Sequence, residues 1–194
     1  MKANRVRIVG GEWRSRCIDF PDGRGLRPTP DRVRETLFNW LGQDLAGKRC
    51  LDLYAGSGAL GFEAASRGAK QVVLVERERV VCAALEASRA ALQAERVQVI
   101  RADALEFLSA DSGVYDVVFL DPPFADDPWA QLFERLPQRL APGALVYRES
   151  GEKQKRQAAP EGWTVFKQGR AGQVNYQLLK RTTHDDQSGL PRNV

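Results

Sequence analysis

The sequence is poor in the residues that build metal sites and disulfide frameworks. It has one histidine, His184, and three cysteines, Cys17, Cys50 and Cys82, which are far apart and form no Cys-x-x-Cys pair. An odd number of scattered cysteines argues against a disulfide framework or a zinc site and is typical of a reducing cytoplasm. The sequence therefore predicts no metal and no catalytic histidine.

Long apolar segments are also missing. No uncharged apolar stretch approaches the ~20 residues that a transmembrane helix needs. Residues 1–9 are basic but lack the apolar centre of a secretion signal. With 43% hydrophobic and 28% charged residues among 194, the composition is that of an ordinary folded domain. We expect a monomeric cytoplasmic protein with one sizeable core and no membrane partner.

Positive charge is concentrated at the N-terminus. Residues 1–34 hold nine Lys and Arg against four Asp and Glu, a net charge of +5, whereas the remaining residues sum to −1. Eight of the nine are arginine, whose planar guanidinium suits paired hydrogen bonds to phosphate. A basic segment on a neutral body indicates a polyanionic partner, and a solvated charged surface is the alternative.

The order of apolar segments predicts an α/β protein. Residues 5–9 and 13–20 form a predicted hairpin, and a helix follows with Thr29 as its expected N-cap and Gly42 as its stop. Strands are then expected at 50–54, 71–76, 96–100, 115–121 and 144–149, alternating with helices that end near 67 or cover 79–94, 104–108 and 129–140. Two closing strands, at 163–168 and 174–180, are joined by a loop too short for a crossover helix.

This alternation predicts a mostly parallel sheet that is covered on both faces and ends in an antiparallel hairpin. We divide the chain into a basic N-terminal hairpin and helix (1–45), an α/β domain (46–181) and a polar tail that we expect to be disordered (182–194).

A glycine-rich turn follows the first strand of the alternating region. Gly56, Gly58 and Gly61 satisfy the pattern Gly-x-Gly-x-x-Gly, which lets the backbone turn sharply and approach a ligand. Glu76 lies 20 residues beyond Gly56, at the end of the next strand, where a carboxylate can bind a ribose diol. The pattern predicts a nucleoside cofactor without saying which one.

Two more acids narrow the choice of cofactor. Asp52, just before the glycine turn, would repel a pyrophosphate but can face the ammonium of S-adenosylmethionine. Asp103 follows the third strand, where it can bind an adenine amino group, cap the next helix, or do both. The glycines and Glu76 alone would also allow an NAD-dependent oxidoreductase, although Asp52 argues against it.

The tetrapeptide Asp121-Pro122-Pro123-Phe124 ends the fourth strand of the alternating region. Proline has no backbone N–H to extend a sheet, so the two prolines stiffen a turn and hold the carboxylate and the ring in a fixed relation. Such a pair suits a planar substrate with an amino group, as in a nucleobase. A tight turn with a capping aspartate is the alternative. Glu149 ends the fifth strand and either lines the same cleft or caps a turn.

With these motifs the chain resembles class I S-adenosylmethionine-dependent methyltransferases, and among them the RsmD family, which methylates the exocyclic N2 of a guanine in 16S ribosomal RNA. The matching segments are 5–11, 25–41, 52–61, 121–124 and 172–174. They are spread over nearly the whole chain up to residue 181, and the block around Arg27-Pro28-Thr29 is the most specific. Relatives often carry threonine where this chain has Pro30, which removes one possible hydroxyl contact.

The resemblance implies a Rossmann-like sheet of seven strands, S-adenosylmethionine as cofactor, and 16S rRNA or an assembling small ribosomal subunit as partner. It implies that the cofactor is held by Asp52, Tyr54, Ala55, Gly56, Ser57, Gly58, Glu76, Arg77, Asp103 and Ala104, and the base by Asp121, Pro122, Pro123 and Phe124. The expected RNA contacts are Arg5, Arg7, Arg14, Arg16, Arg27, Thr29, Arg32, Arg34 and Arg170.

Two other functions stay open. An amino-methyltransferase acting on DNA adenine or cytosine, or on a protein glutamine, would use the same turn, because all these acceptors present an amine. A catalytically inactive RNA-binding assembly factor is also possible, although the intact glycine turn and Asp121 argue against it. Whether Asp121 accepts the proton of the amine or only orients it is likewise left open.

Overall fold

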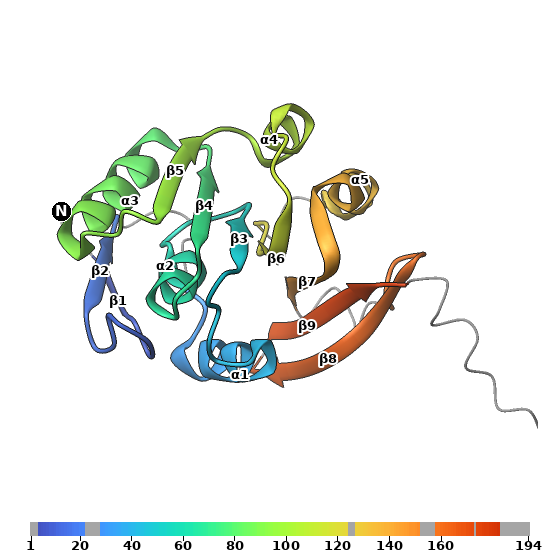
Figure 1. The fold of residues 1–194 in the computed structure, drawn as a ribbon, viewed down its shortest axis with the longest axis horizontal. Coiled ribbons are helices and arrows are strands. Elements are labelled where there is room, and N and C mark those ends of the chain that lie inside the picture. The colour runs from blue at the N-terminus through green and yellow to red at the C-terminus, as the bar shows by residue number, and fades with distance from the viewer. Residues whose placement is uncertain (1–3, 22–27, 124–126, 152–157, 173, 183–194) are drawn as a thin grey trace, which may run out of the picture.

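A seven-stranded sheet crosses the molecule in the order β5-β4-β3-β6-β7-β9-β8 (Figure 1). The computed structural model describes residues 4–21, 28–123, 127–151, 158–172 and 174–182. The strands are β3 (Arg49–Asp52), β4 (Gln71–Glu76), β5 (Val97–Arg101), β6 (Tyr115–Leu120), β7 (Leu140–Gly151), β8 (Trp163–Ala171) and β9 (Val174–Arg181). The first five are parallel, and β9 runs antiparallel to both β7 and β8. The predicted fold class is confirmed.

Helices cover both faces of this sheet, as alternating apolar strands require. Helices α1 (Asp31–Leu41), α2 (Ala59–Ser66) and α3 (Arg79–Leu92) supply side chains to one core cluster, and α4 (Ala104–Ala110) and α5 (Trp129–Arg135) supply them to the other (Figure 1). Successive residues of β4 alternate between the two clusters, with Val72 and Leu74 in the first and Val73 and Val75 in the second. Within the described ranges, no helix is long and apolar enough to cross a membrane.

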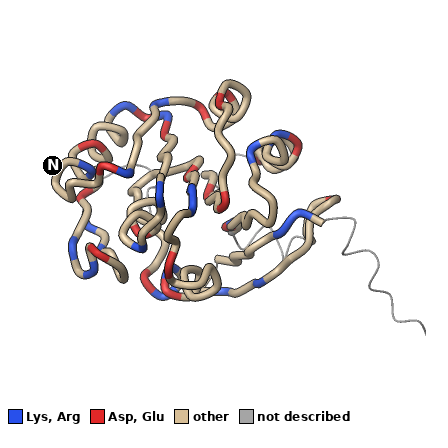
Figure 2. Tube along the Cα trace, in the orientation of Figure 1, with Lys and Arg blue, Asp and Glu red and all other residues tan. Residues whose placement is uncertain are grey.

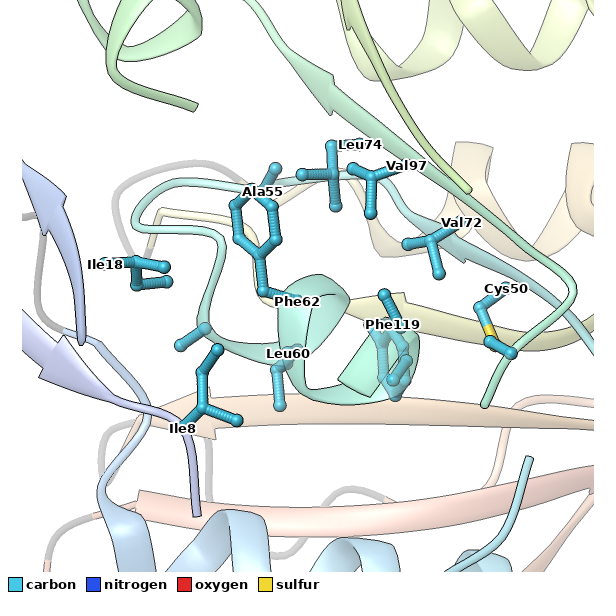
Figure 3. Packing of buried hydrophobic residues seen from close by; sticks show 14 of the residues in the cluster. Ile8, Ile18, Cys50, Ala55, Leu60, Phe62, Val72, Leu74, Val97 and Phe119 are labelled. Carbon is cyan, nitrogen blue, oxygen red and sulfur yellow. The ribbon is translucent and has the colours of Figure 1, made fainter. Parts of the chain in front are cut away.

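The N-terminal hairpin packs on the first of these clusters. It consists of β1 (Asn4–Arg7) and β2 (Cys17–Phe20), which pair antiparallel. Ile8 and Ile18, both 1% exposed, lie beside Leu60 and Phe62 of α2 (Figure 3). The hairpin therefore shares its core with the α/β domain.

Two helix boundaries differ from the prediction. Helix α1 begins at Asp31 with Pro30 at the N-cap and no side-chain cap bond, so the prediction that Thr29 caps it is wrong. The helix expected at 129–140 ends at Arg135 and continues as a 3₁₀ turn, η1 (Leu136–Arg139), before β7 begins at Leu140. A register shift opposite Tyr115 and Val117 of β6 lets β7 carry its proline and glycine inside the strand.

Arg34 is buried, so the prediction that it contacts RNA is wrong. The side chain is 1% exposed and each of its three nitrogens donates to an acceptor inside the protein. Its Nε donates to the carbonyl of Thr29 at 3.1 Å, and Nη1 donates to Glu63 Oε2 at 3.2 Å. Its Nη2 donates to the carbonyl of Arg7 at 2.6 Å and to the carboxylate of Asp31. One guanidinium thus joins β1, the start of α1 and α2.

Glu63 of α2 is the acid at the centre of this network and is fully buried. Besides Arg34, it accepts from Nε of Arg67 at 2.9 Å and from the backbone N–H of Val9 at 2.8 Å. A buried charge is tolerated only when it is paired and hydrogen-bonded, and these three donors meet that condition.

Glu63→Gln should lower the free energy of unfolding by about 3 kcal/mol, because it leaves the side chains of Arg34 and Arg67, which are 1% and 9% exposed, without their shared negative partner. Urea unfolding followed by circular dichroism measures this change. Arg5→Ala is the control, since Arg5 and Asp19 form an exposed pair that contributes less than about 1 kcal/mol. Equal effects of the two substitutions would contradict the prediction.

Candidate active site

The two predicted motifs follow neighbouring parallel strands, β3 and β6, and therefore lie at the same end of the sheet. β3 lies between β4 and β6, and the chain leaves it toward β4 first and reaches β6 only later, so the strand order reverses beside β3. The glycine turn follows the carboxyl end of β3, and the Asp121-Pro122-Pro123 turn follows the carboxyl end of β6. In open α/β sheets ligands bind at this kind of switch point.

Each glycine of the turn has a physical reason. Gly56 and Gly58 have φ of 48° and 78°, a region that side chains disfavour, and Gly58 is the residue from which α2 starts. A Cβ on Gly61 would lie 2.1 Å from Cδ2 of Leu74. Gly61 therefore lets α2 approach β4, and the first two glycines shape the turn. Ala55 and Ser57, on either side of Gly56, are buried, and Tyr54 is half-buried.

Glu76 ties this turn to the end of β4. Its Oε2 accepts the backbone N–H of Gly56 at 3.1 Å, and its Oε1 accepts that of Glu78 at 2.9 Å. A carboxylate has about four lone-pair positions, so both oxygens can accept further hydrogen bonds. Arg77, the next residue, is exposed and lies 3.7 Å from the carboxylate of Glu78.

Asp103 caps α4, which confirms one of its two predicted roles. Its Oδ1 accepts the backbone N–H groups of Leu105 at 2.8 Å and Glu106 at 3.2 Å. The side chain is exposed beyond the end of β5, and Ala104 behind it is buried. Contact of Asp103 with an adenine stays a prediction.

Asp52 is a buried carboxylate with an unused acceptor. It is 2% exposed and accepts backbone hydrogen bonds from Tyr54 and Gly61, yet its Oδ1 has no partner among the described residues. Burial raises its pKa from 3.8 to about 7. A cationic group bound at this edge would compensate the charge. The residues present therefore fit a positively charged cofactor.

Asp121 lies on the neighbouring strand and in a similar environment. Burial, followed by the charges of Glu149 and Asp52, raises its pKa well above the ordinary value. Pro122 is buried and Pro123 is exposed. Phe124 lies outside the described residues. In the described part of the chain, no group of three His, Cys, Asp or Glu side chains is placed to hold a metal ion.

Glu149 joins these two acids as a third, and its partners were not predicted. It is 5% exposed on β7 and accepts the hydroxyl of Tyr147 at 2.9 Å. The hydroxyl of Thr29 is its second donor. Thr29 is only 4% exposed and its hydroxyl donates to Glu149, so its contact with RNA stays a prediction. The only sign of the Tyr147–Glu149 hydrogen bond in the sequence was a tyrosine two residues before an acid at the end of a strand.

Most of the other predicted RNA contacts do lie at the surface. Arg5, Arg7, Arg14, Arg16, Arg32 and Arg170 are exposed. Several also have protein partners: Arg5 pairs with Asp19 at 2.8 Å, Arg7 with Asp31 at 3.1 Å, and Arg16 donates to the carbonyl of Ala91 at 2.6 Å. Arg170 donates to the carbonyl of Gly172 at 2.9 Å. Figure 2 shows basic and acidic positions interleaved along the N-terminal hairpin. Arg27 and the tail beyond residue 182 lie outside the described residues.

Known proteins resemble this chain in sequence and in fold. The family model described as conserved hypothetical protein 95 matches residues 6–180. Ribosomal RNA small subunit methyltransferase D of Escherichia coli is 41% identical over 181 residues, which cover 92% of this chain and 91% of that protein. The solved structure of a putative methyltransferase, yhhF, from Escherichia coli superposes with a TM-score of 0.81 at 42% identity, covering 92% and 98% of the two chains.

A more distant structure has the same fold. It is a putative methyltransferase solved in complex with SAH, 16% identical, with a TM-score of 0.72 over 91% of this chain and 55% of that one. The fold is that of a class I methyltransferase, with the glycine turn and the Asp-Pro-Pro turn at its switch point. Within that class, the chain belongs to the RsmD family, whose model spans it almost completely.

Asp52→Asn should make the ligand-free protein more stable near neutral pH. Burial raises the pKa of Asp52 to about 7, so the folded chain holds this proton more tightly than the unfolded chain. The stability that Asp52 contributes is therefore complete below about pH 4 and is lost as pH rises through about 7.

Melting temperatures measured between about pH 5 and 8 should fall less in Asp52→Asn than in the native protein. Asp19→Asn is the control, because the side chain of Asp19 is 55% exposed. The same pH dependence in all three proteins would show that Asp52 is not held in this way.

Proposed function

We propose that this protein transfers a methyl group from S-adenosylmethionine to the exocyclic N2 of a guanine in 16S ribosomal RNA. The observation that carries the proposal is the placement of Asp52 and Asp121 on adjacent strands, one beside the glycine turn and the other in the Asp-Pro-Pro turn. A relative named Ribosomal RNA small subunit methyltransferase D, which aligns with nine-tenths of the chain, supports ribosomal RNA as the substrate.

The cofactor site is built from the ends of β3, β4 and β5. Asp52 would face the cationic amino-acid part, the turn from Tyr54 to Gly58 would border it, and Glu76 would accept hydrogen bonds from the ribose. Asp103 and Ala104 at the start of α4, with Arg77, would border the adenine. S-adenosylmethionine supplies a methyl group on a sulfonium, which is an excellent leaving group.

The acceptor site must overcome the weak nucleophilicity of the guanine amine, whose lone pair is delocalised into the ring. Asp121 and the carbonyl of Pro122 accept its two N–H bonds and so direct the lone pair toward the methyl group. Because the turn is stiffened by proline, this orientation is set before the base arrives, and positioning supplies much of the rate. Phe124 stacks on the base, which contributes about 1–3 kcal/mol to binding in comparable cases.

The target guanine must leave its helix, since N2 of a paired guanine lies in the minor groove. Proteins that read RNA sequence usually take unstacked bases for this reason. The exposed arginines of the N-terminal hairpin and of α1 hold the phosphates on either side. Arg32 lies in the first turn of α1, three residues after Thr29, and so stands close to the acceptor site.

Asp121→Ala should abolish methyl transfer and leave cofactor binding intact, because Asp121 contacts the acceptor rather than the cofactor. Transfer of labelled methyl to the small subunit measures the first effect, and calorimetry with S-adenosylhomocysteine the second. Glu134→Ala, at an exposed position of α5, is the control. If the Asp121 variant loses affinity for S-adenosylhomocysteine, the assigned role is wrong.

The acceptor itself is tested with the native protein. Labelled methyl should appear at N2 of one guanine when small subunits or 16S rRNA from a strain lacking the gene are supplied, and mass mapping locates it. Methyl found instead on DNA adenine or cytosine, or on a protein glutamine, would replace this proposal by the corresponding amino-methyltransferase.

Arg32→Ala should weaken RNA binding about uniformly across sequences and reduce the salt dependence of log K by about one phosphate contact. Fluorescence anisotropy at several salt concentrations gives the slope. Lys48→Ala is the matched control, because Lys48 is exposed but precedes β3 at the opposite edge of the sheet. An unchanged slope in the Arg32 variant would remove that residue from the RNA interface.

A further inference from the structure

Three acids occupy the carboxyl ends of three adjacent strands, and the proposed chemistry uses only two of them. Asp52 ends β3, Asp121 follows β6, and Glu149 lies near the end of β7. Glu149 belongs to neither of the two predicted motifs, the glycine turn and the Asp-Pro-Pro turn. Yet it is almost completely buried, which is unfavourable for a carboxylate unless its surroundings hold it.

The register of the sheet brings Glu149 next to Asp121. Phe119 pairs with Tyr147 and Leu120 with Arg148, so the following residues, Asp121 and Glu149, are neighbours across the two strands. Side chains two residues apart share a face of a strand, and Phe119 and Tyr147 contact each other on that face, with ring centroids 6.4 Å apart. Asp121 and Glu149 therefore extend the row begun by these rings.

The groups that hold Glu149 are hydroxyls. Tyr147, fully buried, donates at 2.9 Å, and Thr29 donates from the segment before α1. Opposite it on β9 lies Tyr176, which is 6% exposed. Among the described residues, the titratable groups that surround Glu149 are thus Tyr147, Tyr176 and Asp121, with Asp52 one strand further. Burial raises the pKa of Glu149, and the two hydroxyl donors oppose this shift because they favour the ionised form of the acid.

We propose that Glu149 is a positioning residue whose negative charge, fixed by the hydroxyls of Tyr147 and Thr29, makes Asp121 the acceptor of the proton that the amine releases. This inference rests on the proposed function, because it assumes an amine acceptor at Asp121. It says which group accepts the proton of the amine, a question that the Asp-Pro-Pro motif alone leaves open.

The step balances without another reactant. The amine nitrogen forms a bond to the methyl carbon as the carbon–sulfur bond breaks, and the electron pair of that bond stays on sulfur as a neutral thioether. The nitrogen then carries the positive charge and one proton too many. That proton passes to the carboxylate of Asp121, which burial first and the neighbouring charge of Glu149 second make more basic than an ordinary aspartate.

Two substitutions should shift the titration midpoint of the Asp121 carboxyl in opposite directions. Glu149→Gln removes the neighbouring charge, so the carboxyl of Asp121 should titrate at least about one pH unit lower. Tyr147→Phe keeps the ring but removes a donor to Glu149, so the pair should hold its proton to higher pH. A merely structural role would move neither midpoint.

The first readout needs no cofactor and no RNA. Carbon-13 NMR of labelled aspartate carboxyls follows the midpoint of Asp121, which is assigned by its loss in Asp121→Asn. The second readout is the single-turnover methylation rate against pH, whose acid limb should follow the NMR midpoint in each variant. Melting temperature and S-adenosylhomocysteine affinity of both variants establish that they are folded.

The outcomes separate the two proposals. A native protein that methylates guanine N2, with NMR midpoints and acid limbs unchanged in both variants, overturns the role of Glu149 alone. A native protein that leaves guanine unmethylated overturns the proposed function, and an unmoved NMR midpoint would still overturn the coupling of Glu149 to Asp121. Opposite shifts in the two variants, seen in both readouts, support the inference.

Discussion

The buried pairing of Arg34 with Glu63 is the constraint on which the arrangement of this protein depends. Without it, Glu63 of α2 would keep only Arg67 as a charged partner in the core, and the guanidinium that joins β1, the start of α1 and α2 would be lost. The same guanidinium holds the carbonyl of Thr29, whose hydroxyl meets Glu149. One ion pair therefore connects the basic hairpin, the packing of the sheet and the acceptor side of the site.

The site itself is an electrostatic arrangement that is incomplete without a ligand. Asp52 is buried at the end of β3, Asp121 is half-buried directly after β6, and desolvation raises the pKa of each. An ionised carboxylate is tolerated in such surroundings when a bound cation offsets its desolvation penalty. A group that carries both a sulfonium and an ammonium can do this. The desolvation of these two carboxylates, which is unfavourable in the protein alone, is then also what favours binding of a cationic cofactor.

The sequence predicted the sheet, the glycine turn and the Asp-Pro-Pro turn well, because each depends on local rules. Strand periodicity, the positive φ of Gly56 and Gly58, and the missing N–H of proline need no knowledge of the rest of the fold. It failed where tertiary packing decides. Arg34 belongs to the same basic run as Arg32, and only the position of Glu63 separates a buried arginine from an exposed one. Tyr147 looked like an ordinary strand residue until the register placed it beside Glu149.

The depth at which Arg34 is enclosed also limits how this architecture can be recombined. A front end that sits on the outside of an enzyme can be exchanged between relatives, since nothing in the catalytic body depends on it. Here the body supplies a buried acid, Glu63, that is neutralised jointly by Arg67 of the body and Arg34 of the front end. A chimera that grafts a foreign nucleic-acid-binding arm onto residues 46–181 would therefore have to bring an arginine at the same register, or replace Glu63 as well.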